Sequence, residues 1–311
     1  MRVLITGGFG FVGGRMAQRM RSAGHEVLLG SRRAASAPAW LPDSRVVRTV
    51  WDDAAALERI CGDVDLLVHA AGMNAQDCSA NPVAALEFNG VATARLVAAT
   101  KKSKVRRIVY LSTAHVYASP LEGRIDEGTC PRNLHPYATS HVAGENAVLD
   151  KRSGAQCERI VLRLSNIYGS PVDRDVNCWM LLVNDLCRQV VTTGKMVLRS
   201  SGLQQRDFIP MDSFLQLFEN EFASICESNL SGIFNVGSET SLSVLDMVQI
   251  IEKRCQVIFG FRPSLELPPN APQSEQSTFL EFRTKRLAKR EPAVLEVEID
   301  RLLRFCKTAF S

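Results

Sequence analysis

The sequence lacks the features that mark metal-binding, membrane and nucleic-acid-binding proteins. Its nine cysteines include no Cys-x-x-Cys pair and no cluster with histidine, so we expect no metal, and reduced, mostly buried thiols in a cytoplasmic protein. No apolar stretch could span a membrane, and glycines interrupt the apolar run near the N-terminus, so we expect no membrane partner and no signal peptide. The net charge of +4 is mild and its lysines and arginines are scattered, which argues against a nucleic-acid partner.

What the sequence does contain is an alternation of strand-like and helix-like segments through its first half. Strands at this spacing predict right-handed crossovers and a parallel sheet with helices on both faces. We therefore predict an α/β fold with a Rossmann-type doubly wound parallel sheet in residues 1–165, a smaller lobe in residues 166–311, and a return to the sheet near 204–240. The predicted strands are Val3–Ile5, Glu26–Leu29, Val46–Val50, Asp65–His69, Arg107–Leu111 and Arg159–Leu164, and the helices Phe11–Ser22, Ala54–Cys61, Val83–Lys102 and Tyr137–Leu149.

The second half shows a weaker pattern of the same kinds of segment. It closes with a basic helical tail that follows a Pro-rich loop or edge. The segments expected before the tail are a helix at Asn177–Val190, strands at Met196–Leu198 and Ile233–Val236, a helix at Val244–Lys253 and the Pro-rich stretch Pro263–Pro272.

A glycine-spaced turn follows the first predicted strand and opens the first helix. Gly7, Gly10 and Gly13 let the backbone turn tightly and approach phosphates, and the helix N-terminus offers free N–H groups to negative charge. An ordinary Gly-rich turn is the alternative. The position after a strand and before a helix favours a dinucleotide site that includes Phe11 and Val12.

The residues after the second and third strands bear on the choice of cofactor. Ser31, Arg32 and Arg33 stand where an acidic residue would bind the ribose of NAD, and arginines suit a 2′-phosphate, so NADP is favoured and NAD stays possible. A solvated loop is the alternative for these arginines. Asp52 could accept from the adenine amino group or, beside Asp53, cap a helix.

The fourth and fifth strands also end in residues that suit a site at the carboxyl edge. Ala70 and Ala71 are small enough for the backbone to pass close to a cofactor, whereas His69 is expected to be a satisfied core histidine. The hydroxyls of Ser112 and Thr113 are expected to point toward the cofactor site, where a substrate would lie.

Tyr137 opens a predicted helix, and His141 follows one turn later. A tyrosine beside a base-type side chain can exchange a proton with a carbonyl or an alcohol if a cation lowers its pKa. Alone, the two could be ordinary helix-face residues. The glycine turn and the hydroxyls after the fifth strand favour the catalytic interpretation.

Taken together, these residues resemble a known family. The chain resembles the extended short-chain dehydrogenase/reductases, in particular the NAD(P)-dependent epimerase/dehydratase family that acts on nucleotide sugars. The resemblance runs nearly end to end through ITGGFGFVG (5–13), HAAG (69–72), FNGVAT (88–93), LSTAHVY (111–117), PYATSHVAGE (136–145), RLSNIYGS (163–170), QRDFIPMDSF (205–214) and GIFNVGS (232–238).

The resemblance implies roles for individual residues. Thr113, together with Ser112, would contact the substrate, and Tyr137 would transfer the proton. Asn89 would lie near the cofactor. In the C-terminal lobe, Asn166 would contact the substrate or position the loop, and Arg206 would bind a substrate phosphate. An ordinary surface arginine is the alternative for Arg206.

One departure concerns the Tyr-x-x-x-Lys pattern, which here ends in His141. In the family the lysine holds the nicotinamide ribose and lowers the tyrosine pKa, so the resemblance places His141 among the catalytic and cofactor-binding residues. An ordinary histidine pKa is about 6.5, so the ring is mostly uncharged at neutral pH. Three outcomes are open: slower chemistry with an acid-shifted optimum, a compensating cation nearby, or no turnover.

A second departure from the family pattern narrows the set of possible reactions. Ala114 and His115 replace the Asp and Glu that 4,6-dehydratases carry, which leaves ketoreduction or epimerisation. The arginines after the second strand favour a reductase of a keto group on a nucleotide-linked sugar. An epimerase with retained NAD and a catalytically silent dinucleotide-binding protein are the alternatives. In similar proteins the helices at Val83–Lys102 and Tyr137–Leu149 form a dimer seam, so we also expect a homodimer.

Overall fold

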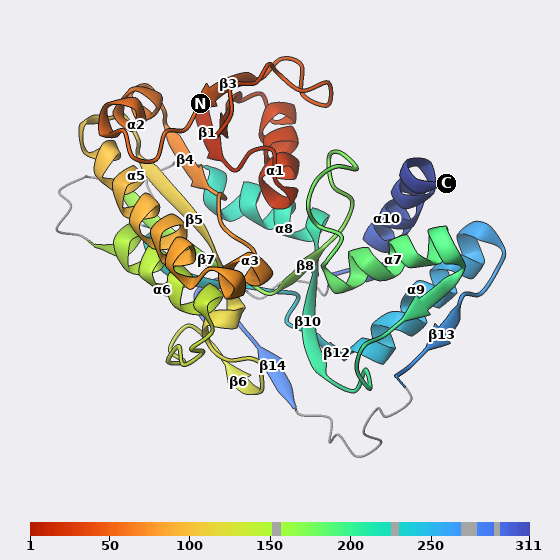
Figure 1. Cartoon of the computed structure of the whole chain (residues 1–311). Coiled ribbons are helices and arrows are strands. Elements are labelled where there is room, and N and C mark those ends of the chain that lie inside the picture. Colours follow the sequence, from red (N-terminus) through yellow and green to blue (C-terminus); the bar gives the residue numbers. More distant parts are fainter. Residues whose placement is uncertain (151–156, 225–229, 269–278, 289–292) are drawn as a thin grey trace. The chain divides into compact units, whose positions relative to one another are not determined.

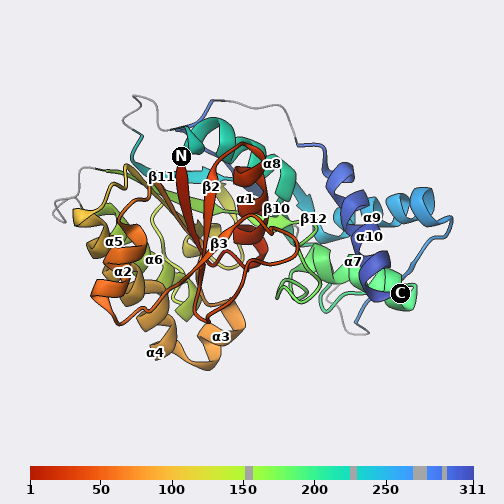
Figure 2. The ribbon, with the colours of Figure 1, turned by 90° about the horizontal axis from the view of Figure 1, so that it is seen from above.

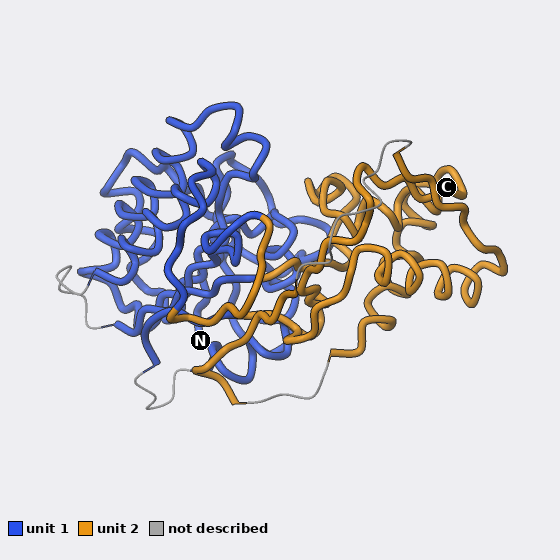
Figure 3. Tube along the Cα trace, turned by 90° about the horizontal axis from the view of Figure 1, so that it is seen from below, with its two compact units in different colours: residues 1–119, 129–164, 215–235 blue, residues 120–128, 165–214, 236–311 orange. Residues whose placement is uncertain are grey.

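The computed structural model describes residues 1–150, 157–224, 230–268, 279–288 and 293–311. The chain divides into two compact units, coloured separately in Figure 3. The first unit consists of residues 1–119, 129–164 and 215–235, and the second of residues 120–128, 165–214 and 236–311.

The first unit is built on a seven-stranded sheet with the strand order β11-β7-β5-β4-β1-β2-β3. Pairing is parallel between β1 and both β2 and β4, between β2 and β3, and from β4 through β5 to β7. This confirms the predicted α/β class with a parallel Rossmann-type sheet. The strands are β1 (Arg2–Thr6), β2 (Glu26–Ser31), β3 (Arg45–Arg48), β4 (Leu66–His69), β5 (Arg107–Thr113), β7 (Glu158–Leu164) and β11 (Gly232–Val236).

The central strands are continuous apolar runs because both faces of the sheet are covered. Val3, Leu4 and Ile5 of β1 are completely buried, whereas no residue of the edge strand β3 is. Figures 1 and 2 show α5 and α6 on one face of the sheet and α1 on the other. The helices and helical turns of this unit are α1 (Phe11–Ser22), α2 (Ala54–Cys61), α3 (Ala75–Ala80), α4 (Pro82–Ala85), η1 (Leu86–Ala92), α5 (Thr93–Ala99), η2 (Thr100–Lys102), η3 (Ala114–Val116), α6 (Pro136–Leu149) and η5 (Phe218–Ala223).

The prediction of one regular helix over Val83–Lys102 is wrong in detail, because η1 is a π-helical segment inside it. The Thr93 hydroxyl donates to the Asn89 carbonyl at 2.7 Å, which competes with the regular backbone ladder. Gly90 and Gly144 let η1 and α6 approach closely, since a Cβ at Gly144 would lie 2.5 Å from the Asn89 oxygen.

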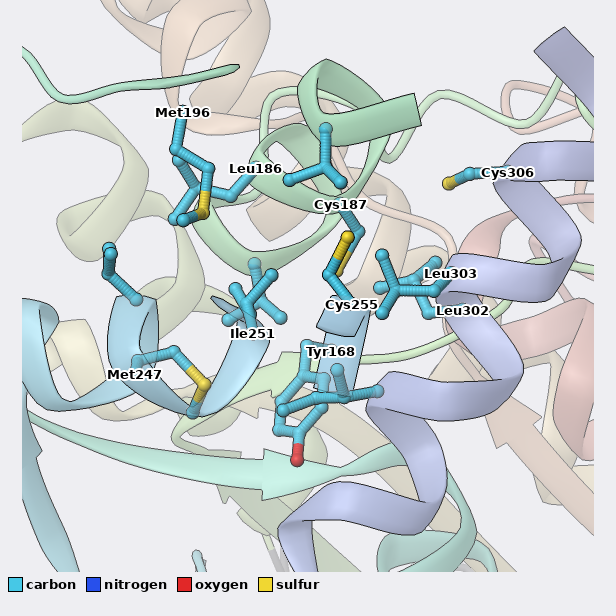
Figure 4. Packing of buried hydrophobic residues seen from close by; sticks show 14 of the residues in the cluster. Tyr168, Leu186, Cys187, Met196, Met247, Ile251, Cys255, Leu302, Leu303 and Cys306 are labelled. Carbon is cyan, nitrogen blue, oxygen red and sulfur yellow. The ribbon is translucent and has the colours of Figure 1, made fainter. Parts of the chain in front are cut away.

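The second unit has its own hydrophobic core, formed by α7, α9, α10 and β9 around Tyr168 (Figure 4). Cys187 and Cys255 lie close together there among leucine and isoleucine side chains, and Cys306 of α10 is buried in the same cluster. Its elements are β6 (Gly123–Ile125), β8 (Asn166–Tyr168), α7 (Leu182–Thr193), β9 (Lys195–Val197), β10 (Gln205–Pro210), β12 (Ser241–Ser243), α9 (Val244–Phe259), β13 (Ser264–Glu266), β14 (Leu280–Phe282) and α10 (Leu295–Phe310), while α8 (Met211–Leu217) crosses into the first unit.

The strands of the second unit form three small sheets: β12-β10-β8, β13-β9 and β14-β6. The helix predicted at Asn177–Val190 begins only at Leu182, and the helix predicted to end at Lys253 continues to Phe259, where Gly260 adopts a left-handed conformation. The terminal helix α10 is present, but it is basic only toward its end. Its first turn is acidic, as the helix dipole favours. Part of the predicted Pro-rich stretch, residues 269–272, lies outside the described residues.

Two expectations from composition can be compared with the described parts of the chain. No helix there has the length and apolar character needed to cross a bilayer. Eight cysteines are described, all are free, and six of them are buried, which confirms mostly buried thiols for this part of the sequence. The ninth, Cys226, lies outside the described residues.

Candidate active site

The turn between β1 and α1 forms a backbone cradle at the carboxyl edge of the sheet. Gly7 has a φ of +68°, and a Cβ there would lie 2.7 Å from the Ala70 oxygen and the Ala71 nitrogen. A Cβ at Gly13 would lie 2.3 Å from the Gly7 oxygen. Gly10 caps α1 without a side chain, so the first N–H groups of the helix, from Phe11 onward, are not taken by a side-chain cap. These features fit a dinucleotide pyrophosphate.

The end of β2 carries the arginines predicted to select the cofactor. Arg32 and Arg33 are exposed, and the Arg32 guanidinium lies 5.7 Å from the centre of the Phe88 ring. Ser31 pairs in register with Arg48 of β3, a third exposed arginine that the sequence reasoning missed. No carboxylate among the described residues forms an ion pair with these three arginines.

Asp52 is exposed after β3 and does not cap a helix. The cap of α2 is Asp53, whose carboxylate accepts from the backbone N–H of Ala56 at 2.9 Å. The capping alternative for Asp52 is therefore wrong. Its contact with an adenine stays a prediction.

His69, the last residue of β4, is bonded at both ring nitrogens. Its Nδ1 lies 2.6 Å from the Thr6 hydroxyl, and its Nε2 lies 2.9 Å from the Thr93 hydroxyl. Because Thr93 donates its own hydrogen to the Asn89 carbonyl, it accepts from Nε2–H, and Nδ1 accepts from Thr6. Burial lowers the pKa of His69 to about 3, so the ring is neutral. The expectation of a satisfied core histidine is confirmed.

Asn89 is fully buried, and its side chain is used inside the protein. Its oxygen accepts from the backbone N–H of Met73 at 2.9 Å, and its nitrogen donates to the Ser140 hydroxyl at 3.0 Å. Asn89 thus ties the loop after β4 to α6, next to the half-buried Ala70 and Ala71. A direct contact of any of the three with a cofactor stays a prediction.

Tyr137 and Thr113 come together where β5 ends and α6 begins. The Thr113 hydroxyl accepts from the backbone N–H of His115 at 3.1 Å. Loss of water around Tyr137 raises its pKa, while a hydrogen bond with Thr113 lowers it by a smaller amount. No lysine or arginine among the described residues of the first unit hydrogen-bonds to Tyr137, so the compensating cation is not found there.

His141 lies one turn after Tyr137 and packs edge-on against it, with ring centres 4.6 Å apart. The imidazole is buried, and burial lowers its pKa to about 4, so it is neutral. Its Nδ1 lies 2.8 Å from the hydroxyl of Tyr110 on β5. His141 therefore cannot supply the permanent charge of the lysine whose place it takes.

Ser112 lies two residues after Tyr110 on the same face of β5, and it contacts Glu145 in the turn of α6 that follows His141. Ser112 donates to Glu145 at 2.6 Å, and Glu145 forms a buried ion pair with Arg163, whose Nε lies 2.9 Å from the carboxylate. Ser112 thus faces α6 and holds the helix to the sheet, and its predicted substrate contact stays a prediction. Tyr110 and Glu145 were missed from the sequence, although the spacings 110/112 on a strand and 141/145 on a helix match one shared face.

A third histidine starts the helix that carries Tyr137. His135 precedes α6, and its Nδ1 accepts from the backbone N–H of Tyr137 at 3.1 Å, which makes the imidazole the helix cap. Its Nε2 lies 2.7 Å from the Ser79 hydroxyl. The usual capping residues are Ser, Thr, Asp and Asn, so this role was not predicted.

The two residues predicted to bind substrate from the C-terminal part belong to the second unit. Asn166 donates to the Asp207 carbonyl at 2.9 Å. Arg206 is bonded to the Gln204 side chain at 2.8 Å and has no carboxylate partner among the described residues, and burial lowers its pKa. The structure describes each unit by itself, so the contact of either residue with a substrate stays a prediction.

Comparison with known proteins places these observations in a family. Residues 3–237 match the NAD dependent epimerase/dehydratase family. The chain belongs to that family. Its resemblance to the extended short-chain dehydrogenases that act on nucleotide sugars is thereby confirmed.

Individual relatives are distant. The chain is 28% identical to the "Probable low-salt glycan biosynthesis reductase Agl14" of Haloferax volcanii, over 84% of this chain and 81% of the relative. It shares its fold with a UDP-N-acetylglucosamine 4-epimerase of Methanobrevibacter ruminantium (TM-score 0.81, 18% identity, covering 98% of this chain and 97% of the other). It also shares it with a UDP-glucuronic acid 4-epimerase of Bacillus cereus in complex with UDP-glucuronic acid and NAD (TM-score 0.77, 19% identity, full coverage of both). The chain is thus an NAD(P)-dependent, nucleotide-sugar-modifying enzyme by family.

Proposed function

We propose that this protein reduces a keto group of a nucleotide-linked sugar, with Tyr137 as the proton donor. The bound nicotinamide cofactor would supply the hydride. The observation that carries this proposal is the state of the Tyr137 phenol. It keeps its hydrogen at neutral pH because desolvation raises its pKa, and no fixed cation among the described residues of its unit opposes the effect.

The protonated phenol favours one direction of the reaction. Reduction of a carbonyl needs an acid that gives a proton to the developing alkoxide, and a phenol with its hydrogen in place can do so. Oxidation of an alcohol, the first step of an epimerase with retained NAD, needs the phenolate as a base. A family lysine would stabilise that phenolate, and the neutral His141 does not.

Thr113 would help to hold the substrate for protonation by Tyr137. Its hydroxyl lowers the pKa of the nearby Tyr137 phenol, and its oxygen accepts from the backbone N–H of His115 at 3.1 Å. A substrate carbonyl oxygen that replaces the interaction between the two hydroxyls, and accepts a hydrogen bond from each, would be oriented for protonation by Tyr137. One relative, named as a probable glycan biosynthesis reductase, is consistent with this direction.

NADPH is the cofactor that we propose, although the family is described as NAD-dependent. Arg32 and Arg33 follow Ser31 at the end of β2, and Arg48 of β3 pairs with Ser31 in register. None of these exposed arginines has a carboxylate partner in the described part of the chain, which supports a contact with a 2′-phosphate. The double variant Arg32→Asp/Arg33→Ala should shift the ratio of the dissociation constants from NADPH toward NADH. Unchanged affinities for both cofactors in that variant would contradict the role of the arginines.

In the second unit, Arg206 is the proposed partner of a phosphate of the nucleotide sugar. Its guanidinium loses water without gaining a carboxylate among the described residues, which favours an anionic ligand. Asn166, at the start of the neighbouring strand β8, is the proposed second contact. The particular sugar and nucleotide are not specified by these contacts.

The reaction can be tested with purified protein, NADPH and a panel of 4-keto nucleotide sugars. A reductase consumes one NADPH per product, and Tyr137→Phe should lower kcat by about 100-fold or more without changing the Kd of NADPH. Cofactor that stays bound through gel filtration and is not consumed during turnover would instead identify an epimerase. Cofactor binding without turnover of the panel, in both the wild type and His141→Lys, would identify a silent dinucleotide-binding protein.

We also propose a homodimer, as in similar proteins. Val83, Leu86 and Val91 are exposed apolar residues on α4 and η1. Their spacing along adjoining helical segments places them where a second copy of the chain could cover them. Sedimentation of the wild type and of a Val83→Glu/Leu86→Glu variant would test this face, since the variant should be monomeric.

A further inference from the structure

A buried hydroxyl on β5 meets the imidazole of His141, and the proposed reaction does not use it. Tyr110 is 1% exposed, and its phenol oxygen lies 2.8 Å from Nδ1 of His141. Gly144, one turn further along α6, makes room for this contact, because a Cβ there would lie 2.6 Å from the phenol oxygen. The pair therefore depends on a glycine in the middle of a helix.

The hydrogen in this contact can be assigned by counting donors and acceptors. Burial raises the pKa of Tyr110 well above its ordinary value and lowers that of His141, so a neutral phenol faces a neutral imidazole. If Nδ1–H donated to the phenol oxygen, the buried phenol O–H would have no acceptor among the described residues. If the phenol donates, the remaining hydrogen sits on Nε2 of His141. That nitrogen is not one of the fully enclosed side-chain atoms without a partner among the described residues, so solvent or a ligand can accept its hydrogen. An unpaired buried donor is costly, so the second arrangement is favoured.

The same count of donors and acceptors assigns the one hydrogen of the His141 imidazole to Nε2. A neutral imidazole that accepts at Nδ1 carries its hydrogen on Nε2. Nε2 of His141 lies 3.9 Å from the position that a Cβ on Gly72 would occupy, beside the exposed turn after β4. No described residue of the first unit accepts a hydrogen bond from it. Within the first unit, the Nε2–H group of His141 is thus available to a ligand at the carboxyl edge of the sheet.

The fold indicates which part of a dinucleotide would lie there. The pyrophosphate fits the cradle of Gly7 and the start of α1, and the arginines after β2 would hold the adenosine half on one side of it. The nicotinamide half then extends to the other side, over β4 and β5, where Gly72 and His141 lie.

We propose that Tyr110 is a positioning residue that fixes His141 in the Nε2–H tautomer, so that the imidazole gives a neutral hydrogen bond to the nicotinamide ribose. The inference rests on the proposed function, because it requires a bound dinucleotide. It assigns to a tyrosine–histidine pair the ribose contact that a lysine would make, without that lysine's charge.

The tautomer can be measured without any cofactor. In protein with 15N-labelled histidine, long-range 1H–15N spectra distinguish the two tautomers, and His141→Gln assigns the His141 signals. We expect Nε2–H for His141 in the wild type and a mixture of both tautomers in Tyr110→Phe. His69, held by Thr6 and Thr93, should stay Nε2–H in both proteins. A wild-type His141 protonated on Nδ1 would overturn the inference, even if Tyr110→Phe does not fold.

Cofactor affinity tests the ribose contact. Tyr110→Phe should raise the Kd of NADPH by about tenfold, a change of the size expected for one misaligned hydrogen bond. In a His141→Lys background the same substitution should have no effect, because an ammonium group has no tautomer to fix. Tyr168→Phe is the matched control, since it removes a buried phenol hydroxyl that donates to the Leu295 carbonyl in the second unit.

The outcomes separate this inference from the proposed function. A wild type that binds neither NADPH nor NADH contradicts the proposed function, and the ribose contact falls with it. A wild type that binds NADPH but shows the same Kd as a folded Tyr110→Phe contradicts the positioning role alone. Equal losses on adding Tyr110→Phe to the wild type and to the His141→Lys variant would show a general structural effect and would also overturn it.

Discussion

His69 and His141 both contact Tyr110, and they differ in how many of their ring nitrogens are bonded within the described part of the protein. His69 stacks on the Tyr110 ring at 5.4 Å and uses both nitrogens, on Thr6 and Thr93. His141 uses only Nδ1, on the Tyr110 hydroxyl. Both rings are buried and neutral. The comparison teaches that burial and a lowered pKa are common to both rings and do not by themselves mark a functional histidine. The proposed ribose contact depends instead on the open nitrogen of His141.

The largest expected effect is the loss of folding stability when His69 is replaced. His69→Leu should lower the free energy of unfolding by about 2–4 kcal/mol, because the Thr6 hydroxyl loses its buried acceptor and Thr93 loses a donor. His141→Gln should cost about 1 kcal/mol, since it breaks one bond. Urea unfolding of both variants measures the difference. A larger loss for His141→Gln would contradict the contrast between the two rings.

The pH dependence of stability gives an effect whose sign follows from the two pKa values. The folded-state pKa values of about 3 for His69 and about 4 for His141 lie below the ordinary value of 6.5. The unfolded chain therefore binds more protons below pH 6.5, and stability that is complete above that pH is lost as the pH falls toward 4. Each ring contributes up to about 1.4 kcal/mol per pH unit.

Single variants measure the contribution of each imidazole to this pH dependence separately. His69→Leu and His141→Gln should each reduce the slope of unfolding free energy between pH 6 and about pH 4.5. Asp207, whose pKa is raised to about 6 by burial, acts in the opposite direction and is unchanged in both variants. A slope that is the same in the wild type and in either variant would show that the corresponding ring is already charged in the folded protein.

The smallest expected effect extends the comparison to His135, a half-buried ring that accepts a backbone N–H. His135→Ala should cost about 1 kcal/mol of stability through loss of the α6 cap, and His135→Ser should recover most of it. Thermal unfolding of the two variants measures this. Equal losses in both would mean that the contact with Ser79, rather than the cap, stabilises the start of α6.

Much of the fold could be predicted from the sequence because its signals are local. The helix Phe11–Ser22 has the predicted bounds, and the buried β1 follows from the run Val3–Ile5. The interruption at η1 was not predicted, because it depends on the approach of α6 at Gly90 and Gly144. The local pattern of residues in one segment does not reveal its contacts with a segment that is distant in the sequence.

The candidate site was predicted only in part for the same reason. The Tyr137–His141 spacing places both rings on one face of α6, and the structure brings them together. Tyr110, which contacts His141 from another strand, has no sequence signal of its own beyond its spacing to Ser112. The neutral state of His141 could be suspected from its ordinary pKa, but its burial and its bonding partner required the structure.

The most direct test of the central claim is isotope transfer from the cofactor to the substrate. NADPH carrying deuterium at the transferred position of its nicotinamide ring would be incubated with the protein and 4-keto nucleotide sugars, and the product analysed by mass spectrometry. The account predicts one deuterium in the sugar for each NADPH consumed, with the rate of transfer lowered by about 100-fold or more in Tyr137→Phe. A sugar product that carries no deuterium, or that forms without consumption of NADPH, would contradict it.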